Sequence, residues 1–526
     1  MTQLLSKNGL ALVFTFLLLA ALPAAAATIT VTSSADVAAN DGVCTLREAI
    51  TAANTDSPSG GAAGECAAGS GSDAVAFAIP GVGPHIISVA PTKLPDIIQP
   101  LAIDGYTQSG AAANTLAQGS NAVIAVGIDG GVAGYAGLTF QASGSVRGLQ
   151  ITRFQSGITI LLGSVTVAGN FIGTDGSSDL GNFLQGVAVF DSNGVVGGAA
   201  AADRNVISGN DGSAVAANTV SGVLIRNNLI NTDRSGTSAI AGSVGIQLSG
   251  SSSMNQIVDN VVGATDSGIT VSDDSNQTTI ASNRVGVDLA GGNIGGSGWG
   301  ISLIAFDGSP DLTQVGGLAP AERNIIHNWG SGGIRVDRIL ATTEPNGNVF
   351  WGNSLFGNGF GIDLIDSSTG AGVPGVNPND PGDADLGTND LQNYPVLLDA
   401  RWDGIFLLVD FDLDSTPNRN YRIEFFASSA CGTHSEGETF VGSADVALGP
   451  TGIANVTNLA ISGSAASGFL TATATDLTRN NTSEFSNCVA ISQAPAVVVP
   501  TLNGWGLSML ALAVALAGWL FLARRQ

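Results

Sequence analysis

Asparagine recurs through the middle of the chain at alternating short and long intervals, and this spacing constrains the fold more than any other feature. The residues concerned are Asn170, Asn205, Asn228, Asn260, Asn283, Asn324 and Asn348. Their separations are 35, 23, 32, 23, 41 and 24 residues. A unit of about 23 residues that alternates with longer units is typical of a solenoid whose coils carry loop insertions on one side.

One short unit contains three apolar strand-like runs, at 206–208, 214–216 and 222–225, and three strands per turn indicate a β-helix coil. The segments 196–210 and 315–328 also align without a gap, as expected for repeated coils. We therefore predict an all-β protein with a right-handed parallel β-helix over 76–365. The asparagines at the strand ends are predicted to form a ladder inside the coil bends and to satisfy backbone groups.

Composition and charge narrow the function classes. Charged residues make up 11% of the chain and glycine supplies 72 of 526 residues, which favours strands and tight turns. The formal net charge of −24 leaves no basic stripe for nucleic acid, so nucleic-acid binding is excluded.

Both ends of the chain carry features of an exported protein. Residues 1–27 combine Lys7, an apolar run and a small-residue segment, which is the pattern of a signal peptide. Residues 507–523 are uncharged and precede Arg524 and Arg525, so we predict a C-terminal transmembrane helix with its arginines on the cytoplasmic side. The body is then expected at the cell envelope or surface, at least transiently anchored in the inner membrane.

Between these ends we expect four regions. Residues 28–75 form an N-terminal cap with one short helix, whose apolar face holds Leu46, Ala49, Ile50 and Ala53. The β-helix follows over 76–365, and 366–392 form an Asp/Gly/Pro-rich linker. Residues 393–492 are predicted to form a small Ig-like β-sandwich, and 493–526 form a spacer and the tail.

Four cysteines fall into two local pairs, which in an exported chain predict disulfides. The expected bonds are Cys44 with Cys66 and Cys431 with Cys488. A zinc site is disfavoured because no C-x-x-C spacing occurs and the three histidines are scattered.

Two short segments resemble known families of exported bacterial proteins. Residues 44–49, CTLREA, resemble the CSLREA domain with Thr45 in place of serine. Residues 499–506, VPTLNGWG, resemble the IPTL-CTERM sorting signal with Val499 in place of isoleucine, and its motif residues here are Pro500, Thr501, Leu502, Trp505, Gly506, Arg524 and Arg525. This resemblance implies a sorting protease or transpeptidase of the exosortase type as a partner, while the middle of the chain resembles pectate-lyase-like β-helices more loosely.

Acidic residues on the coils raise the possibility of a glycan-active enzyme. Asn231-Thr232-Asp233 and Asp273-Asp274 resemble the carboxylate motifs of polygalacturonases, but the Gly-His-Gly and Arg-Ile-Lys elements of that family are missing. Asp233 also has counterparts at Asp175 and Asp288, each five residues after a repeat asparagine, which favours a role in turns. A lyase would need a basic residue, for which Arg226, Arg284 and Arg323 are candidates. No catalytic residue is therefore assigned.

Two further sets of residues suggest ligand binding. Asp380, Asp383, Asp385 and Asp390 offer the hard oxygen ligands that calcium prefers, although a solvated hinge is the competing interpretation, and no other cofactor is expected. Trp299, Trp329 and Trp351 are spaced close to the coil repeat, so they form either an exposed platform for sugar rings or a buried row of the core.

The sequence thus favours an exported cell-surface protein, a non-enzymatic adhesin or extracellular-matrix component whose partner is a surface or extracellular polysaccharide. One alternative is a polysaccharide lyase or glycoside hydrolase on the β-helix. Another is a spacer that holds a ligand-binding β-sandwich away from the membrane.

Overall fold

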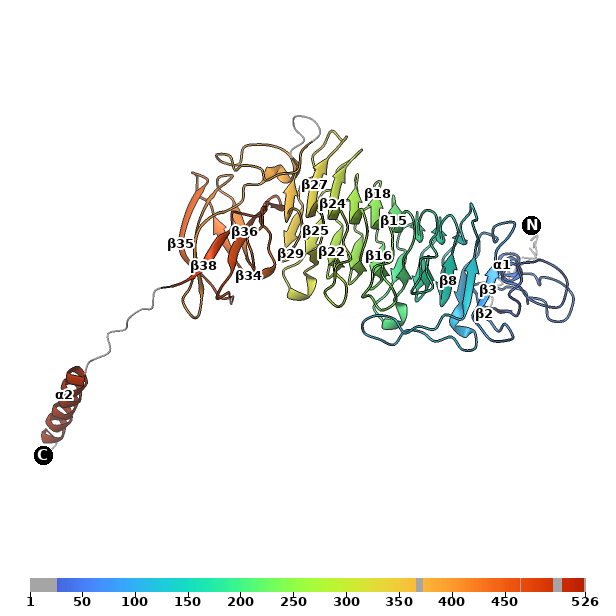
Figure 1. Ribbon diagram of the computed structural model, residues 1–526, viewed down its shortest axis with the longest axis horizontal. Coiled ribbons are helices and arrows are strands. Elements are labelled where there is room, and N and C mark those ends of the chain that lie inside the picture. The colour runs from blue at the N-terminus through green and yellow to red at the C-terminus, as the bar shows by residue number, and fades with distance from the viewer. Residues whose placement is uncertain (1–25, 366–371, 464, 495–503, 525–526) are drawn as a thin grey trace, which may run out of the picture.

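Each coil contains three short apolar runs, and each run adds one strand to one of three parallel sheets, which form the three faces of a solenoid (Figure 1). The computed structural model describes residues 26–365, 372–463, 465–494 and 504–524. Within them, the inward Val, Ile, Leu and Phe side chains form one continuous core along the solenoid. The predicted parallel β-helix is confirmed.

Each of the three sheets is parallel throughout. Sheet 1 contains β1 (Thr28–Val31), β2 (Asp73–Phe77), β4 (Leu101–Asp104), β7 (Gly144–Arg147), β10 (Val165–Ala168), β13 (Val195–Gly197), β16 (Leu224–Arg226), β19 (Gln256–Val258), β22 (Thr279–Ala281), β25 (Gln314–Gly316) and β28 (Val349–Trp351). Sheet 2 contains β3 (His85–Ser88), β5 (Val126–Asp129), β8 (Leu149–Thr152), β11 (Phe171–Ile172), β14 (Val206–Ile207), β17 (Leu229–Ile230), β20 (Val261–Val262), β23 (Arg284–Val285), β26 (Ile325–His327) and β29 (Ser354–Phe356). Sheet 3 contains β6 (Leu138–Phe140), β9 (Ile158–Ile160), β12 (Val187–Val189), β15 (Ser213–Asn218), β18 (Val244–Ser249), β21 (Ser267–Ser272), β24 (Trp299–Ala305), β27 (Gly332–Arg338) and β30 (Ile362–Leu364).

An asparagine ladder runs along the bend between sheets 1 and 2. The side-chain amide of each rung donates to the side-chain oxygen of the next, as from Asn228 Nδ2 to Asn260 Oδ1 at 3.0 Å. The rungs are Asn170, Asn205, Asn228, Asn260, Asn283, Asn324 and Asn353. The predicted ladder is confirmed, but Asn348 is not its last rung. Asn348 lies before β28 and accepts from Thr313 N instead, so the last sequence interval was assigned to the wrong asparagine.

The α-helix α1 (Leu46–Thr55) contributes to the N-terminal end of the core (Figure 1). Its Leu46, Ala49, Ile50 and Ala53 side chains are buried, as predicted. Thr45 and Glu48 form a capping box, in which each side chain accepts from the other residue's backbone N–H. The first disulfide, Cys44–Cys66, lies beside this helix start, and Cys431–Cys488 lies in the second domain; both predicted bonds form. Disulfides persist in oxidising compartments, which agrees with an extracellular protein.

A second β domain follows the solenoid. Its strands are β31 (Val396–Trp402), β32 (Leu407–Asp414), β33 (Asn420–Ser428), β34 (Thr439–Ala447), β35 (Ile453–Ile461), β36 (Phe469–Asp476), β37 (Asn481–Thr482) and β38 (Val489–Gln493). They form one eight-stranded sheet whose outermost strands, β34 and β35, contact each other, so the domain is barrel-like and has its own core.

The second domain docks directly on the last coil (Figure 1). Phe426 and Phe485 belong to the solenoid core. Between the two domains, the short helix η4 (Thr388–Leu391) contributes Leu391 to the same core, and Asn389 Oδ1 accepts from Asn348 N at 3.1 Å.

Three glutamates of the β domain accept the backbone N–H groups that a further coil would otherwise bind. Glu424 accepts from Gly352 N at 2.9 Å and Glu436 accepts from Asn358 N at 3.0 Å. Glu484 completes the set, since its Oε1 accepts from Leu364 N at 3.0 Å. The β domain therefore closes the C-terminal end of the solenoid.

The C-terminal helix α2 spans Gly504–Ala523 and contains Trp505 and Gly506, with Arg524 exposed after it. The signal peptide and the motif residues Pro500, Thr501, Leu502 and Arg525 lie outside the described residues. No helix in the described ranges combines the length and apolarity needed to cross a membrane. The predicted transmembrane helix is therefore not supported; its uncharged run is at the lower length limit of ~17 residues.

We expect Asn228→Ala to lower the free energy of unfolding by about 1–3 kcal/mol, because it leaves buried amide and carbonyl groups without partners. Asn218→Ala is the matched control, since Asn218 is exposed on the same stack of coils. Urea unfolding of both variants measures the difference. Equal midpoints for Asn228→Ala and wild type would show that the ladder does not stabilise the fold.

The buried carboxyls at the junction predict a pH dependence of stability. Burial raises the pKa of Glu424 to about 7 and of Asp363 to about 7, and burial together with the Asp363 charge raises that of Glu484 to about 8. In the unfolded chain such groups titrate near pH ~4. The native state therefore holds extra protons between these values, and stability falls as pH rises from about 4 to about 8, by about 1.4 kcal/mol per pH unit for each proton retained.

Urea unfolding at a series of pH values measures this slope. Glu484→Gln keeps an acceptor oxygen for Leu364 N without a charge, so we expect it to flatten the decline. A wild-type stability that rises over the same range would contradict the prediction.

Candidate functional site

A long connection lies across the outer face of sheet 2 and borders a groove of the solenoid. Residues 108–125, called the strap here, link the short helix η1 (Gly105–Thr107) to β5. Arg204 donates to Ala117 O at 2.8 Å, and Arg234 donates to Ala122 O at 2.6 Å. The strap covers a small apolar cluster on the outside of sheet 2, made by Ala122, Phe171, Val206, Leu229, Val261 and Ile294.

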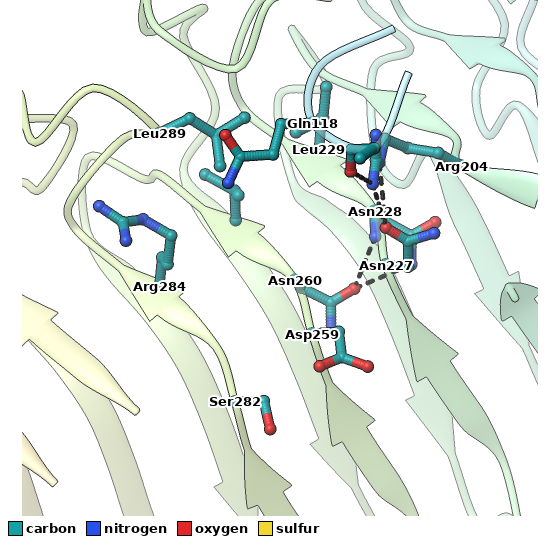
Figure 2. Close-up of a pocket in the computed structure, with 12 residues that line it drawn as sticks. Gln118, Arg204, Asn227, Asn228, Leu229, Asp259, Asn260, Ser282, Arg284 and Leu289 are labelled. Carbon is teal, nitrogen blue, oxygen red and sulfur yellow. Dashed lines mark hydrogen bonds between the residues drawn. The ribbon is translucent and has the colours of Figure 1, made fainter. Parts of the chain in front are cut away.

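Beside the strap, a groove of about 230 Å³ opens on the outer face of sheet 2 (Figure 2). Leu229 and Val261 from β17 and β20 form part of its lining, with Leu289 from the loop after β23. Gln118 of the strap lies near Leu289, while Arg284 lies at another side. The groove therefore combines apolar side chains with convergent polar groups, the usual composition of a small-molecule site.

The charged groups of the groove have different surroundings. Arg204 is 8% exposed, and burial lowers its pKa. Its guanidinium also donates to Asn227 Oδ1 and to Gly119 O, so it fixes the strap. Asp259 is half exposed and pairs with Arg226 at 2.8 Å. Arg284 donates through Nε and Nη2 to one carbonyl, Asp288 O.

The acids that resemble polygalacturonase motifs hold turns in the structure. The Asp233 carboxylate accepts from Thr237 N and Ser238 N, both at 3.1 Å, and Asp175 and Asp288 accept from backbone N–H groups of their own loops in the same way. Asp273 Oδ1 accepts from Asp307 N, and Asp274 Oδ1 accepts from Ser309 N, which join neighbouring coils. The turn interpretation of these acids agrees with this geometry.

The candidate basic residues are also engaged. Arg226 pairs with Asp259, and the Arg323 guanidinium lies 4.0 Å from the centroid of the Phe440 ring of the β domain. Arg284 alone of the three lines the groove.

The three tryptophans do not form a row. Trp299 lies on sheet 3, is 7% exposed and stacks on Phe360 at 6.2 Å, whereas Trp329 is in the solenoid core at 1% exposed. Trp351 is half-buried on sheet 1. The coil spacing was a correct signal of the repeat, but insertions place the three indoles on different faces. The three tryptophans therefore form neither the exposed platform nor the buried row that their spacing left open.

Three of the four predicted calcium ligands come together. Carboxylate oxygens of Asp380, Asp383 and Asp385 lie within 4.8 Å of one another. Burial raises the pKa of Asp383 to about 6, and the neighbouring Asp380 charge adds to this effect. Asp390 lies elsewhere, where it accepts from Arg479 and from Asn481 Nδ2. The three clustered carboxylates have the hard-oxygen chemistry that suits calcium.

Sequence reasoning missed the strap, the groove and two neighbouring acids on sheet 3, Asp337 and Asp363. Asp363 lies opposite Arg335 in the strand register, and the charge of nearby Asp337 helps to raise the Asp363 pKa. Asp363 is fully buried, which keeps it away from a polymer at the surface. The strap contacts join residues about a hundred positions apart, and the available signal was the small number of cations in so acidic a chain.

A calcium ion at the three-aspartate cluster predicts that roughly millimolar calcium raises the melting temperature and that chelation reverses the rise. Asp383→Asn is expected to abolish the calcium response, while Asp390→Asn retains it because Asp390 lies outside the cluster. Differential scanning calorimetry of the full chain measures both. The same melting temperature with calcium and with chelator would exclude a stabilising ion here.

No family model and no curated protein matches this sequence. Among solved structures, the crystal structure of the Dettilon tailspike protein is similar at 15% sequence identity, with 76% of this chain and 74% of that chain covered and a TM-score of 0.25. A similarity of this size is too low to transfer a function.

Proposed function

We propose that this chain is an exported surface-display protein, an adhesin or matrix component that binds polysaccharide without cleaving it. The observation that carries the proposal is the use of the candidate catalytic acids. The Oδ1 atoms of Asp233, Asp273 and Asp274 accept from backbone N–H groups of turns and neighbouring coils. A general acid or nucleophile needs an oxygen directed at the substrate.

The architecture suits display. One core runs through the coils, α1 contributes to one end and the β domain closes the other, so the sheets are held as an extended surface. Binding residues are then positioned on short loops of a rigid scaffold.

Attachment at the surface is proposed to use the C-terminal motif. The support is the resemblance of residues 499–506 to the IPTL-CTERM signal, together with two disulfides that suit an exported chain. A sorting enzyme of the exosortase type is the partner implied.

The spacer alternative is disfavoured by the role of the β domain. Its glutamates accept N–H groups of the last coil, and its Phe426 and Phe485 complete the solenoid core. Deleting residues 393–492 would therefore damage the β-helix, so loss of adhesion in that deletion would not locate the ligand site.

Cells that produce the wild-type chain are expected to show it at the surface, cleavable by added protease and shortened at its C-terminus by intact mass. The double variant Pro500→Ala/Trp505→Ala, which changes the sorting motif, is expected to stay full length and inaccessible. A full-length product in both cells would contradict sorting by tail cleavage.

Incubating the purified wild-type protein with polysaccharide distinguishes binding from catalysis. We expect polysaccharide to be retained while its chain length, followed by light scattering, stays constant. A progressive fall in chain length that is lost in Asp273→Asn would replace the display function with glycan cleavage.

A further inference from the structure

The surroundings of the strap carry positive charge in a strongly acidic protein. The whole chain has 42 acidic and 18 basic residues. In the described ranges, most arginines pair with a carboxylate, but Arg204, Arg234 and Arg284 have no carboxylate oxygen within 4.0 Å. All three lie beside the strap, and their guanidinium groups donate to uncharged oxygens. This part of sheet 2 is therefore a local positive island.

Two of these arginines are used to hold the strap. Arg204 donates through all three guanidinium nitrogens, to Asn227 Oδ1 and to carbonyls of residues 116, 117 and 119. Arg234 donates to Ser120 O at 2.9 Å and Ala122 O at 2.6 Å. Arg204 lines the groove but its donors are largely occupied, whereas Arg234 keeps donors but does not line the groove.

Arg284 keeps donors for a ligand. Its Nε and Nη2 share Asp288 O as acceptor, at 3.0 and 2.7 Å, which fixes the guanidinium at the wall of the groove. A guanidinium has five N–H donors, so most of the Nη1 and Nη2 hydrogens have no partner among the described residues. A fixed arginine with free paired donors matches a carboxylate.

The other groups of the groove select against a bare anion. Asp259 lines it with a carboxylate that is half exposed, and Gln118 lines it with an exposed amide. A ligand with hydroxyl donors can use the Asp259 carboxylate as an acceptor, which a bare anion cannot. Leu289 is half-buried and provides apolar area for one face of a ring, whereas Leu229 and Val261 are almost fully buried. The groove of about 230 Å³ is below the roughly 300–1,000 Å³ of drug-sized sites, which fits one ring and not a longer segment.

We propose that the groove between the strap and the loop after β23 binds a single carboxylate-bearing sugar unit of an acidic polysaccharide. Arg284 binds the carboxylate, Asp259 and Gln118 bind hydroxyl groups, and Leu289 contacts the ring. This inference rests on the proposed function as a polysaccharide-binding display protein and names its ligand class.

The binding energy is expected to come from the charge-assisted contact to Arg284, since the island is small and the protein as a whole repels anions. A neutral sugar would keep the hydroxyl contacts but leave the Arg284 donors without their partner. The corresponding methyl ester tests this directly, because it keeps the ring and removes the charge.

Titration of the full chain with glucuronic acid, its methyl ester and glucose, followed by ligand-observed NMR, tests the proposal. We expect glucuronic acid to bind about tenfold or more tightly than the other two. Arg284→Gln is expected to remove this preference, and Arg284→Lys to retain part of it. Arg147→Gln is the matched control, because Arg147 is an exposed arginine paired with Asp104 away from the groove.

Thermal unfolding of each variant identifies any that fails to fold. Gln118→Ala removes a proposed hydroxyl contact of the groove without changing the charge. Equal binding of the acid and its ester, or a preference unchanged by Arg284→Gln, would overturn the proposal. Surface display that persists in that case would leave the proposed function standing. Acid-selective binding by a chain that is not displayed would instead support the groove and contradict the display function.

Discussion

Hydrogen bonds between successive coils hold the solenoid together, and they create a problem at its last coil. Within the stack, backbone N–H groups at each bend donate to an asparagine side-chain oxygen of the next coil, as from Asn228 N to Asn260 Oδ1. The last coil has donors but no following coil, and a buried N–H without a partner is costly. A carboxyl group offers acceptor oxygens in either protonation state, so Glu424, Glu436 and Glu484 are chemically suited to end the stack. Their burial has its own cost, which appears as the raised pKa values.

The repeat was visible in the sequence because it is local, whereas the junction was not. Spacing of the asparagines predicted the coils and their ladder, and CTLREA predicted a helix that the Thr45–Glu48 capping box begins. The last rung was misassigned because Asn348 fits the short interval of about 23 residues, whereas Asn353, the true rung, lies five residues further on in the next bend. Nothing in the spacing of Glu424 marks it as an acceptor for Gly352, since 72 residues separate them.

The groove was missed for the same physical reason. Arg204 reaches Gly119 across 85 positions and Arg234 reaches Ser120 across 114, so only the folded stack of coils brings the strap to these arginines. The tryptophans show a different limit of sequence spacing. Their spacing reflects the repeat, but insertions change the face of the solenoid on which a residue lies, and Trp329 lies in the core. Periodicity therefore predicts that residues belong to coils, while the side on which each lies depends on every loop before it.

The distribution of charge bears on how such a surface selects its ligand. A net charge of −24 repels acidic polymers at long range, so attraction cannot begin far from the groove. Salt screening limits the electrostatic attraction exerted by Arg204, Arg234 and Arg284 to about 8–10 Å at physiological salt. Only a group that enters the groove meets the free donors of Arg284, and there the contact is specific to a carboxylate. Repulsion of anions by the protein as a whole disfavours non-specific adsorption, and a local positive site then allows discrimination even at modest affinity.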